Sequence, residues 1–140
     1  MSIKWKDVFE NYDRSTDFCT ERGGKIAQFY GKNACAIRMS YAITKAGLPV
    51  TIASDFDDKD GNKYIIKVET MTMFLTDRLG APKEVTAADV KDKRGILIFS
   101  KCCFPAGSGA TGHVDLWDKD AAVGTAYWEY ASSVFFWELD

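Results

Sequence analysis

The chain changes character near Gly95, and this change limits its fold class more than any other feature. Downstream of Gly95, stretches rich in apolar, aromatic and β-branched residues are typical of β-strands. They are "GILIFS" from 95, "HVDLW" from 113, "AYWEY" from 126 and "SVFFWEL" from 133. Their succession along the chain predicts an antiparallel meander.

Upstream of Gly95, two stretches carry apolar residues at helical spacing, which predicts an amphipathic helix in each. Their apolar residues are Trp5, Val8, Phe9 and Tyr12 in the first stretch, and Met71, Phe74, Leu75 and Leu79 in the second. Between these helices, residues 21–33 are predicted as a loop and residues 64–68 as a short strand, and Thr86 with Asp89 indicates a helical turn further on. Helices followed by strands predict an α+β fold in which N-terminal helices pack on the antiparallel sheet.

A third helix, from about residue 34 to residue 46, is marked at both ends. Asn33 is a good N-cap residue, Gly47 suits the position after the last turn, and Pro49 follows where a helix cannot continue. This helix would place Cys35 in its first turn.

Composition excludes several classes of protein. With 140 residues, 46% of them hydrophobic and 27% charged, the chain is expected to fold as one domain over residues 1–140. A formal net charge of -2 argues against binding to nucleic acid through a basic face. No apolar run is long enough for a membrane span, and the N-terminus lacks the pattern of a signal peptide. We therefore expect synthesis in the cytoplasm.

Metal and cofactor sites are not expected. The four cysteines, Cys19, Cys35, Cys102 and Cys103, form no CxxC pair, and the presence of a single histidine argues against a zinc site. The acidic run at residues 55–61 resembles a calcium loop but lacks glutamate at the twelfth position, so a solvated turn is the better interpretation.

Cys35 is the candidate nucleophile. At the start of a helix, its sulfur would lie near the positive end of the helix dipole and near unpaired backbone N–H groups, which favour a thiolate and can also bind an oxyanion. The alternative is a small buried core residue, and position alone does not decide between the two.

His113 is the candidate general base, because it is the only histidine of the chain. It follows a glycine-rich approach and begins a predicted strand, although a packed or surface histidine is the alternative. A third group would hold the imidazole in the required tautomer, and the candidates are Asp115, Asp118 and Asp120. Asp115 lies two residues after His113, on the same face of a regular strand.

Several segments together resemble the type VI secretion amidase effector 4 family, which belongs to the NlpC/P60 papain-like amidases. They are "NACAIRMSYAITKAG", "YIIKV" with the helix ending "RLGAPKEV", "RGILIF", "ATGHVDLWD" and "YWEYASSVFFWEL", in the family's order and over nearly the whole chain. Cys35 matches the family nucleophile and His113 the family base.

The resemblance implies a peptidoglycan amidase that cuts the bond between D-glutamate and meso-diaminopimelate in the stem peptide of a competing bacterium. It also implies delivery by type VI secretion to the target periplasm, a cognate immunity protein, and no cofactor. The alternative is a weakened or inactive relative that binds peptidoglycan or a partner protein.

The chain departs from the family pattern at one place. The family has an aspartate flanked by two cysteines before an aromatic pair, and an ungapped count from Tyr127 places Ala122 and Ala126 at the cysteines and Gly124 at the aspartate. Asp115 or Asp120 could substitute, or a backbone carbonyl or water could orient His113. We expect substitution, with Asp115 as the third catalytic residue.

Overall fold

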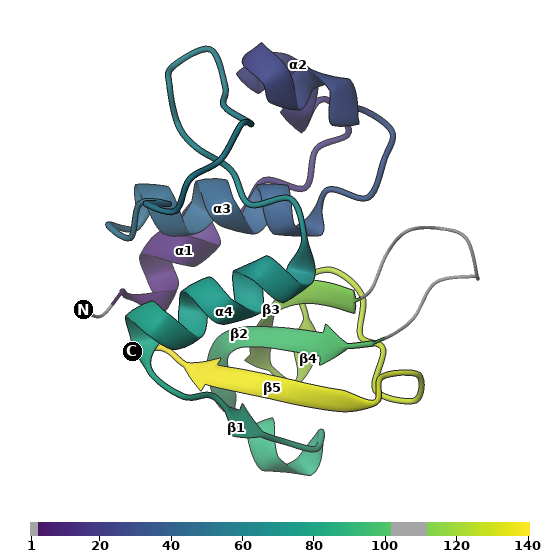
Figure 1. Ribbon diagram of the computed structural model, residues 1–140. Coiled ribbons are helices and arrows are strands. Elements are labelled where there is room, and N and C mark those ends of the chain that lie inside the picture. Colours follow the sequence, from purple (N-terminus) through teal and green to yellow (C-terminus); the bar gives the residue numbers. More distant parts are fainter. Residues whose placement is uncertain (1–2, 102–111) are drawn as a thin grey trace.

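The computed structural model describes residues 3–101 and 112–140, and it combines helices with a five-stranded antiparallel sheet. The helices lie on one side of the molecule and the sheet on the other, and both α3 and α4 pack directly against the sheet (Figure 1). The α-helices are α1 (Trp5–Asn11), α2 (Phe18–Arg22), α3 (Cys35–Lys45) and α4 (Val68–Leu79), with 3-10 turns η1 (Gly24–Phe29) and η2 (Ala88–Val90). The strands are β1 (Lys83–Glu84), β2 (Lys93–Ser100), β3 (Gly112–Lys119), β4 (Ala121–Ala122) and β5 (Ser133–Glu138). The predicted α+β class is confirmed.

The sheet is not the meander that the strand succession predicts. Its order is β1-β5-β2-β3-β4, so β5 does not continue beyond β3 but returns to the other side of β2. The long connection from residue 123 to residue 132 makes this return possible. Consequently β2 is central, and the β3 residue His113 lies opposite Phe99 of β2.

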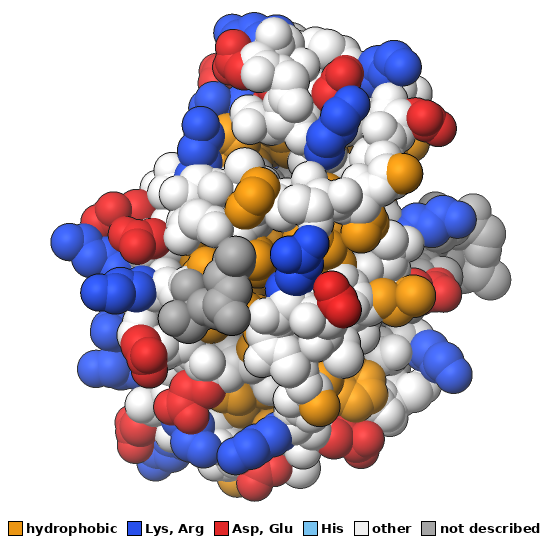
Figure 2. Space-filling view, turned by 60° about the vertical axis from the view of Figure 1, so that its left-hand side comes forward, with side chains coloured by type: hydrophobic (Ala, Val, Ile, Leu, Met, Phe, Trp, Pro, Cys, Tyr) orange, Lys and Arg blue, Asp and Glu red, His pale blue; other side chains and the backbone are white. Residues whose placement is uncertain are grey.

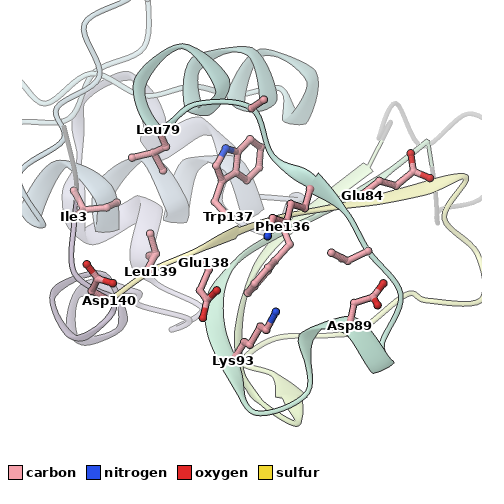
Figure 3. A pocket seen from close by; sticks show the side chains of 13 residues that line it. Ile3, Leu79, Glu84, Asp89, Lys93, Phe136, Trp137, Glu138, Leu139 and Asp140 are labelled. Carbon is pink, nitrogen blue, oxygen red and sulfur yellow. The ribbon is translucent and has the colours of Figure 1, made fainter.

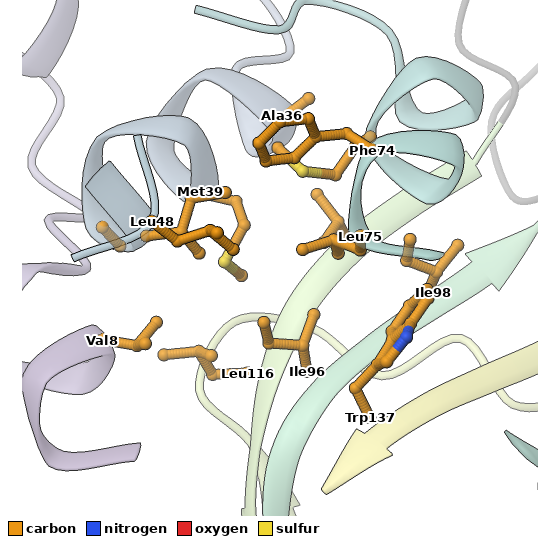
Figure 4. Close-up of a cluster of buried hydrophobic side chains, with 14 of the residues drawn as sticks. Val8, Ala36, Met39, Leu48, Phe74, Leu75, Ile96, Ile98, Leu116 and Trp137 are labelled. Atoms are coloured by element: carbon orange, nitrogen blue, oxygen red, sulfur yellow. The ribbon is translucent and has the colours of Figure 1, made fainter. Parts of the chain in front are cut away.

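The continuous apolar sequence of the central strand β2 follows from its place in the sheet, because side chains on both of its faces are buried. Ile96 and Ile98 point into the main core, while Leu97 and Phe99 point to a second apolar cluster on the opposite face. In the main core, side chains of α1, α3 and α4 converge on the sheet, as Figure 4 shows for Met39, Leu75 and Ile96 among others. The sheet therefore carries an apolar layer on each side.

Helix α3 is anchored along its length in this core. It buries seven of its eleven residues, and Ser40 at its centre uses its hydroxyl group twice. Ser40 Oγ donates to the Ala36 carbonyl at 2.8 Å and accepts the Ile65 amide at 2.9 Å. The helix ends before Gly47, whose φ of 104° suits glycine. This anchoring fixes the position of the first turn and of Cys35.

The structure has no strand at two of the predicted positions, residues 64–68 and residues 126–130. Residues 64–67 have no regular structure, because Ile65 bonds to Ser40 instead of to a strand, and Val68 already begins α4. Residues 126–127 have no regular structure and residues 128–130 form a turn, since Tyr127 and Trp128 pack on the second cluster rather than pairing along a sheet. The predicted loop at 21–33 contains η1, whereas the helical turn expected near Thr86 is confirmed, with Asp89 Oδ2 accepting the Thr86 amide at 2.8 Å.

The acidic turn is more than a solvated surface feature, because Asp58 is buried. Its carboxylate accepts the Tyr64 hydroxyl at 2.6 Å, the amides of Asp60 and Asn62, and the Asn62 side chain at 3.0 Å. Burial alone would raise the pKa of Asp58, but the hydrogen bonds from Tyr64 and Asn62 hold it below its ordinary value. Asp58 therefore organises the segment that leads into Tyr64 and α4.

We predict that Asp58→Ala lowers the free energy of unfolding by about 2–4 kcal/mol, because it leaves the buried Tyr64 hydroxyl without its acceptor. Urea unfolding checks this, with Asp60→Ala as the control, since Asp60 is exposed in the same turn. Equal stability of the two variants would contradict the structural role of Asp58.

Candidate active site

Helix α3 begins at Cys35 itself, one residue later than the sequence suggests. Ala34 occupies the N-cap position without a side-chain cap, and Asn33 lies just outside it. The prediction that Asn33 is the N-cap residue is thus wrong, although Asn33 Oδ1 still accepts a hydrogen bond from the Cys35 amide at 3.4 Å. Cys35 is the first helical residue, at the positive end of the helix dipole.

The Cys35 thiol is free and largely enclosed, with 7% of the residue exposed. It forms part of the main core together with Ala36 and Met39, and its thiol hydrogen bonds to the imidazole of His113. Cysteine and histidine, 78 positions apart in the sequence, are therefore neighbours. Cys102 and Cys103 lie outside the described residues.

His113 is held by three kinds of contact. Its Nε2 atom lies 2.8 Å from Asp115 Oδ2, which leaves Nδ1 as the ring nitrogen for the Cys35 thiol. The imidazole stacks on Phe99, with ring centroids 6.1 Å apart, and meets the Tyr127 ring edge-on at 5.2 Å. These rings restrict rotation of the imidazole and keep it between the sulfur and the carboxylate.

Asp115 is fully buried and completely hydrogen-bonded. Besides His113, it accepts the backbone amides of Leu116 at 2.8 Å, Gly124 at 2.9 Å and Thr125 at 2.8 Å. A buried carboxylate is costly unless donors surround it, and here three backbone amides and an imidazole do so. The arrangement fixes the carboxylate group of Asp115 beside His113.

The charges around His113 favour its protonated form. Burial alone would lower the pKa of the imidazole, but the hydrogen bonds to Asp115 and Cys35 and the negative charges of those groups overcome it and raise the pKa to about 9. The geometry thus suits an imidazolium that stabilises a thiolate on one side and is stabilised by a carboxylate on the other.

Among the three candidate aspartates, the structure brings Asp115 to His113. The side chain of Asp118 instead forms an ion pair with Arg94, with Nε and Oδ1 2.8 Å apart. Asp120 lies in the turn between β3 and β4, where its amide donates to the Asp118 carbonyl at 2.7 Å. The i, i+2 spacing within β3 accounts for the contact between Asp115 and His113.

The segment after α1 completes the surroundings of the site, and the sequence analysis missed it. Burial raises the pKa of the Tyr12 phenol above its ordinary range, and the charges of Asp115 and Cys35 act in the same direction, which places Tyr12 near both. Arg38 of α3 donates to the carbonyls of Asp13 and Ser15, and Arg14 donates to the Val123 carbonyl at 2.8 Å. The only sequence signal was the position of Arg38, three residues after Cys35.

In the part of the chain that the structure describes, no group of three or more histidine, cysteine or acidic side chains could hold a metal ion, and no helix is long and apolar enough to cross a membrane. Lysine, arginine and acidic side chains are interspersed on the face shown in Figure 2.

A cavity of about 550 Å³ lies between the end of α4, β1 and the C-terminal residues, where Trp137 and Phe136 line it (Figure 3). It does not contain Cys35, His113 or Asp115.

An α+β fold with a helix-terminal cysteine, a histidine and an aspartate in hydrogen-bonded succession has a geometry suited to acyl transfer by a thiol nucleophile. Comparison with protein families shows the family: the model of the type VI secretion system amidase effector protein 4 family, Tae4, matches residues 31–137. The chain belongs to this family and is an amidase effector of type VI secretion.

Solved structures agree with this assignment. The type VI effector Tae4 from Enterobacter cloacae is 28% identical, with a TM-score of 0.85 over 100% of this chain and 98% of that chain. The Tae4–Tai4 effector–immunity complex from the same organism gives 27% identity and a TM-score of 0.82 over the whole of both chains. The Salmonella typhimurium effector Tae4 bound to the Enterobacter cloacae immunity Tai4, at 24% identity and a TM-score of 0.84 over 99% of each chain, shares the fold. None of the curated proteins matches the chain.

We predict that iodoacetamide alkylates Cys35 below neutral pH about tenfold or more faster than Cys19, because Cys35 adjoins an imidazolium and a helix N-terminus. Cys19 is the matched control: it is also buried and free, and burial raises the pKa of its thiol. Mass mapping of each cysteine peptide measures the two rates. Preferential labelling of Cys19 would contradict an activated Cys35.

We also predict that His113 makes stability depend on pH. Because its pKa of about 9 in the folded chain exceeds the ordinary 6.5, its contribution is fully present below about pH 6.5 and is lost as the pH rises through 9. The loss should be roughly 3 kcal/mol in the free energy of unfolding. Denaturant unfolding of wild type and His113→Gln across this range checks it, and parallel pH profiles would contradict it.

Proposed function

We propose that the chain is a cysteine-dependent peptidoglycan amidase of the NlpC/P60 papain-like type, folded as a single domain over residues 1–140. Its substrate would be the bond between D-glutamate and meso-diaminopimelate in bacterial stem peptides. One observation carries the proposal: the Cys35 thiol hydrogen bonds to the chain's only imidazole, whose Nε2 lies 2.8 Å from a buried carboxylate. The family supplies amide hydrolysis as the reaction.

In the first half of the reaction, Cys35 Sγ attacks the γ-carbonyl carbon of the D-glutamyl residue while His113 holds the thiol proton. The carbonyl oxygen becomes an oxyanion beside the N-terminus of α3. There, the amides of Ala36 and Ile37 precede the first intrahelical hydrogen bond, which Arg38 donates to Ala34. These amides and the helix dipole are the groups that would stabilise the oxyanion.

In the second half, the carbon–nitrogen bond breaks and the imidazolium of His113 gives its proton to the leaving amine of diaminopimelate. The product left on the enzyme is a thioester of Cys35. Water, deprotonated by His113, attacks the thioester carbonyl, releases the γ-carboxylate and returns the proton to sulfur. The imidazole alternates between base and acid, which fits a pKa raised to about 9 by a nearby carboxylate and thiol.

Asp115 would orient His113 and stabilise its imidazolium through the 2.8 Å contact to Nε2. An inactive relative would be favoured by Gly124, which stands at the position of the family aspartate. Asp115 supplies an acid at the imidazole from a different position, so an active amidase is the better supported proposal.

The family also suggests a biological setting. We infer delivery by type VI secretion to the periplasm of target bacteria, where peptidoglycan lies, and protection of the producing cell by an immunity protein. The effector–immunity complexes of the Enterobacter cloacae relative support such a partner for this chain.

The test is digestion of defined muropeptides, with products identified by mass. We predict that Cys35→Ala and His113→Ala abolish cleavage at the D-glutamyl bond, since one removes the nucleophile and the other the only imidazole. Asp115→Asn should reduce kcat roughly 10²–10⁴-fold, because the neutral amide no longer stabilises the imidazolium.

Asp120→Asn is the matched control, because it makes the same chemical change in the turn after β3 and should leave turnover unchanged. Circular dichroism of each variant establishes that it is folded. Turnover in folded Cys35→Ala would overturn the proposed nucleophile, and equal losses in Asp115→Asn and Asp120→Asn would overturn the role of Asp115.

A further inference from the structure

The loop after β4 holds the Asp115 carboxylate through its backbone. The amides of Gly124 and Thr125 donate to Oδ1 and Oδ2 at 2.9 and 2.8 Å, so the two carboxylate oxygens are each bound by one loop amide. With Oδ2 also in contact with His113, the plane of the carboxylate is determined by this loop. The loop thereby sets the direction in which Asp115 faces the imidazole.

Gly124 leaves the space that the carboxylate occupies. A Cβ atom built on Gly124 would lie 2.3 Å from Asp115 Oδ2 and 3.1 Å from its Cγ, well inside van der Waals contact. The backbone of Gly124 does not require glycine, because it is not among the residues with positive φ. Glycine is therefore required at this position because a larger side chain would occupy the space of Asp115 Oδ2, the atom in contact with His113.

We propose that Gly124 is a positioning residue, whose missing side chain and amide together hold Asp115 against His113. The inference rests on the proposed function for its effect on catalysis, but its effect on the imidazole is independent of substrate. Since Asp115 is already bound by four donors, a side chain at 124 cannot be relieved by a small rotation of the carboxylate. Either Asp115 or the loop must move, and both movements break the contact to Nε2.

The geometry further implies that positions 115 and 124 can exchange the acid. The Cβ position on residue 124 is 2.3 Å from the present site of Oδ2, about the distance from Cβ to a carboxylate oxygen within an aspartate. An aspartate at 124 could place an oxygen where Oδ2 now lies, 2.8 Å from Nε2, provided that residue 115 has no side chain. The two acids exclude each other, but either one can serve His113.

The experiment follows the only imidazole of the chain by NMR, so that its single titration curve needs no assignment. In Gly124→Ala, we predict that the midpoint falls from about 9 by at least one pH unit toward 6.5. We also predict that kcat on a muropeptide falls on the order of 10²-fold with little change in KM, because residue 124 contacts Asp115 rather than substrate. Ala121→Ser, which adds one atom at an exposed position of the neighbouring strand β4, is the control and should keep the wild-type midpoint.

The decisive variant is the pair Asp115→Gly with Gly124→Asp. It should restore a raised midpoint and most of the kcat that Asp115→Gly alone loses, whereas Gly124→Asp alone should be as impaired as Gly124→Ala. A wild-type midpoint in folded Gly124→Ala, or a double variant no better than Asp115→Gly, would overturn the proposal. If Gly124→Ala does not fold, the double variant decides. Because the midpoint is measured without substrate, an inactive wild type would refute the proposed function and leave this inference testable.

Discussion

The contact between the buried Asp115 carboxylate and His113 is the interaction on which the arrangement of the site depends. A carboxylate with no exposed surface is unstable unless donors surround it, and here donors come from three places: the imidazole, the following residue of β3, and the loop at Gly124 and Thr125. The acid therefore ties the sheet, the loop and the imidazole together. Because the same contact favours the imidazolium, it links the packing of the protein interior to the protonation state that thiol chemistry requires.

Cys35 is positioned by a second set of contacts, which does not involve Asp115. Helix α3 is held by its buried face and by Ser40, which joins it to the segment before α4, so its first turn has a fixed position relative to β3. Arg38, one turn after Cys35, binds the carbonyls of Asp13 and Ser15, and Arg14 between them binds Val123 beside Gly124. A chain of contacts thus runs from the cysteine helix through the segment after α1 to the loop that holds Asp115. The helix that carries Cys35 and the loop that holds Asp115 are therefore connected by contacts within the protein.

Local sequence patterns were sufficient for most elements and for the candidate residues. Terminal signals marked α3 and hence Cys35, a continuous apolar run marked β2 and alternation marked β3, and the single histidine left one choice of imidazole. What local patterns do not contain is pairing between distant segments: the return of β5 to β2, and the packing of Tyr127 and Trp128 on Phe99 and Trp117, which makes an aromatic stretch a turn rather than a strand. The space requirement at Gly124 was invisible for the same reason, because it depends on a carboxylate nine residues away in the chain.

The loop after β4 does not have to carry an acid of its own, because the carboxylate in contact with His113 lies on β3. Asp115 lies within β3 and is held there by the strand ladder, opposite Leu97 of the central strand. Once the acid is on the strand, the loop has to supply only backbone amides and empty space. Gly124 meets both needs, and alanines at positions 122 and 126 suffice on either side. Glycine at position 124 is therefore compatible with an acid beside His113, because β3 supplies that acid.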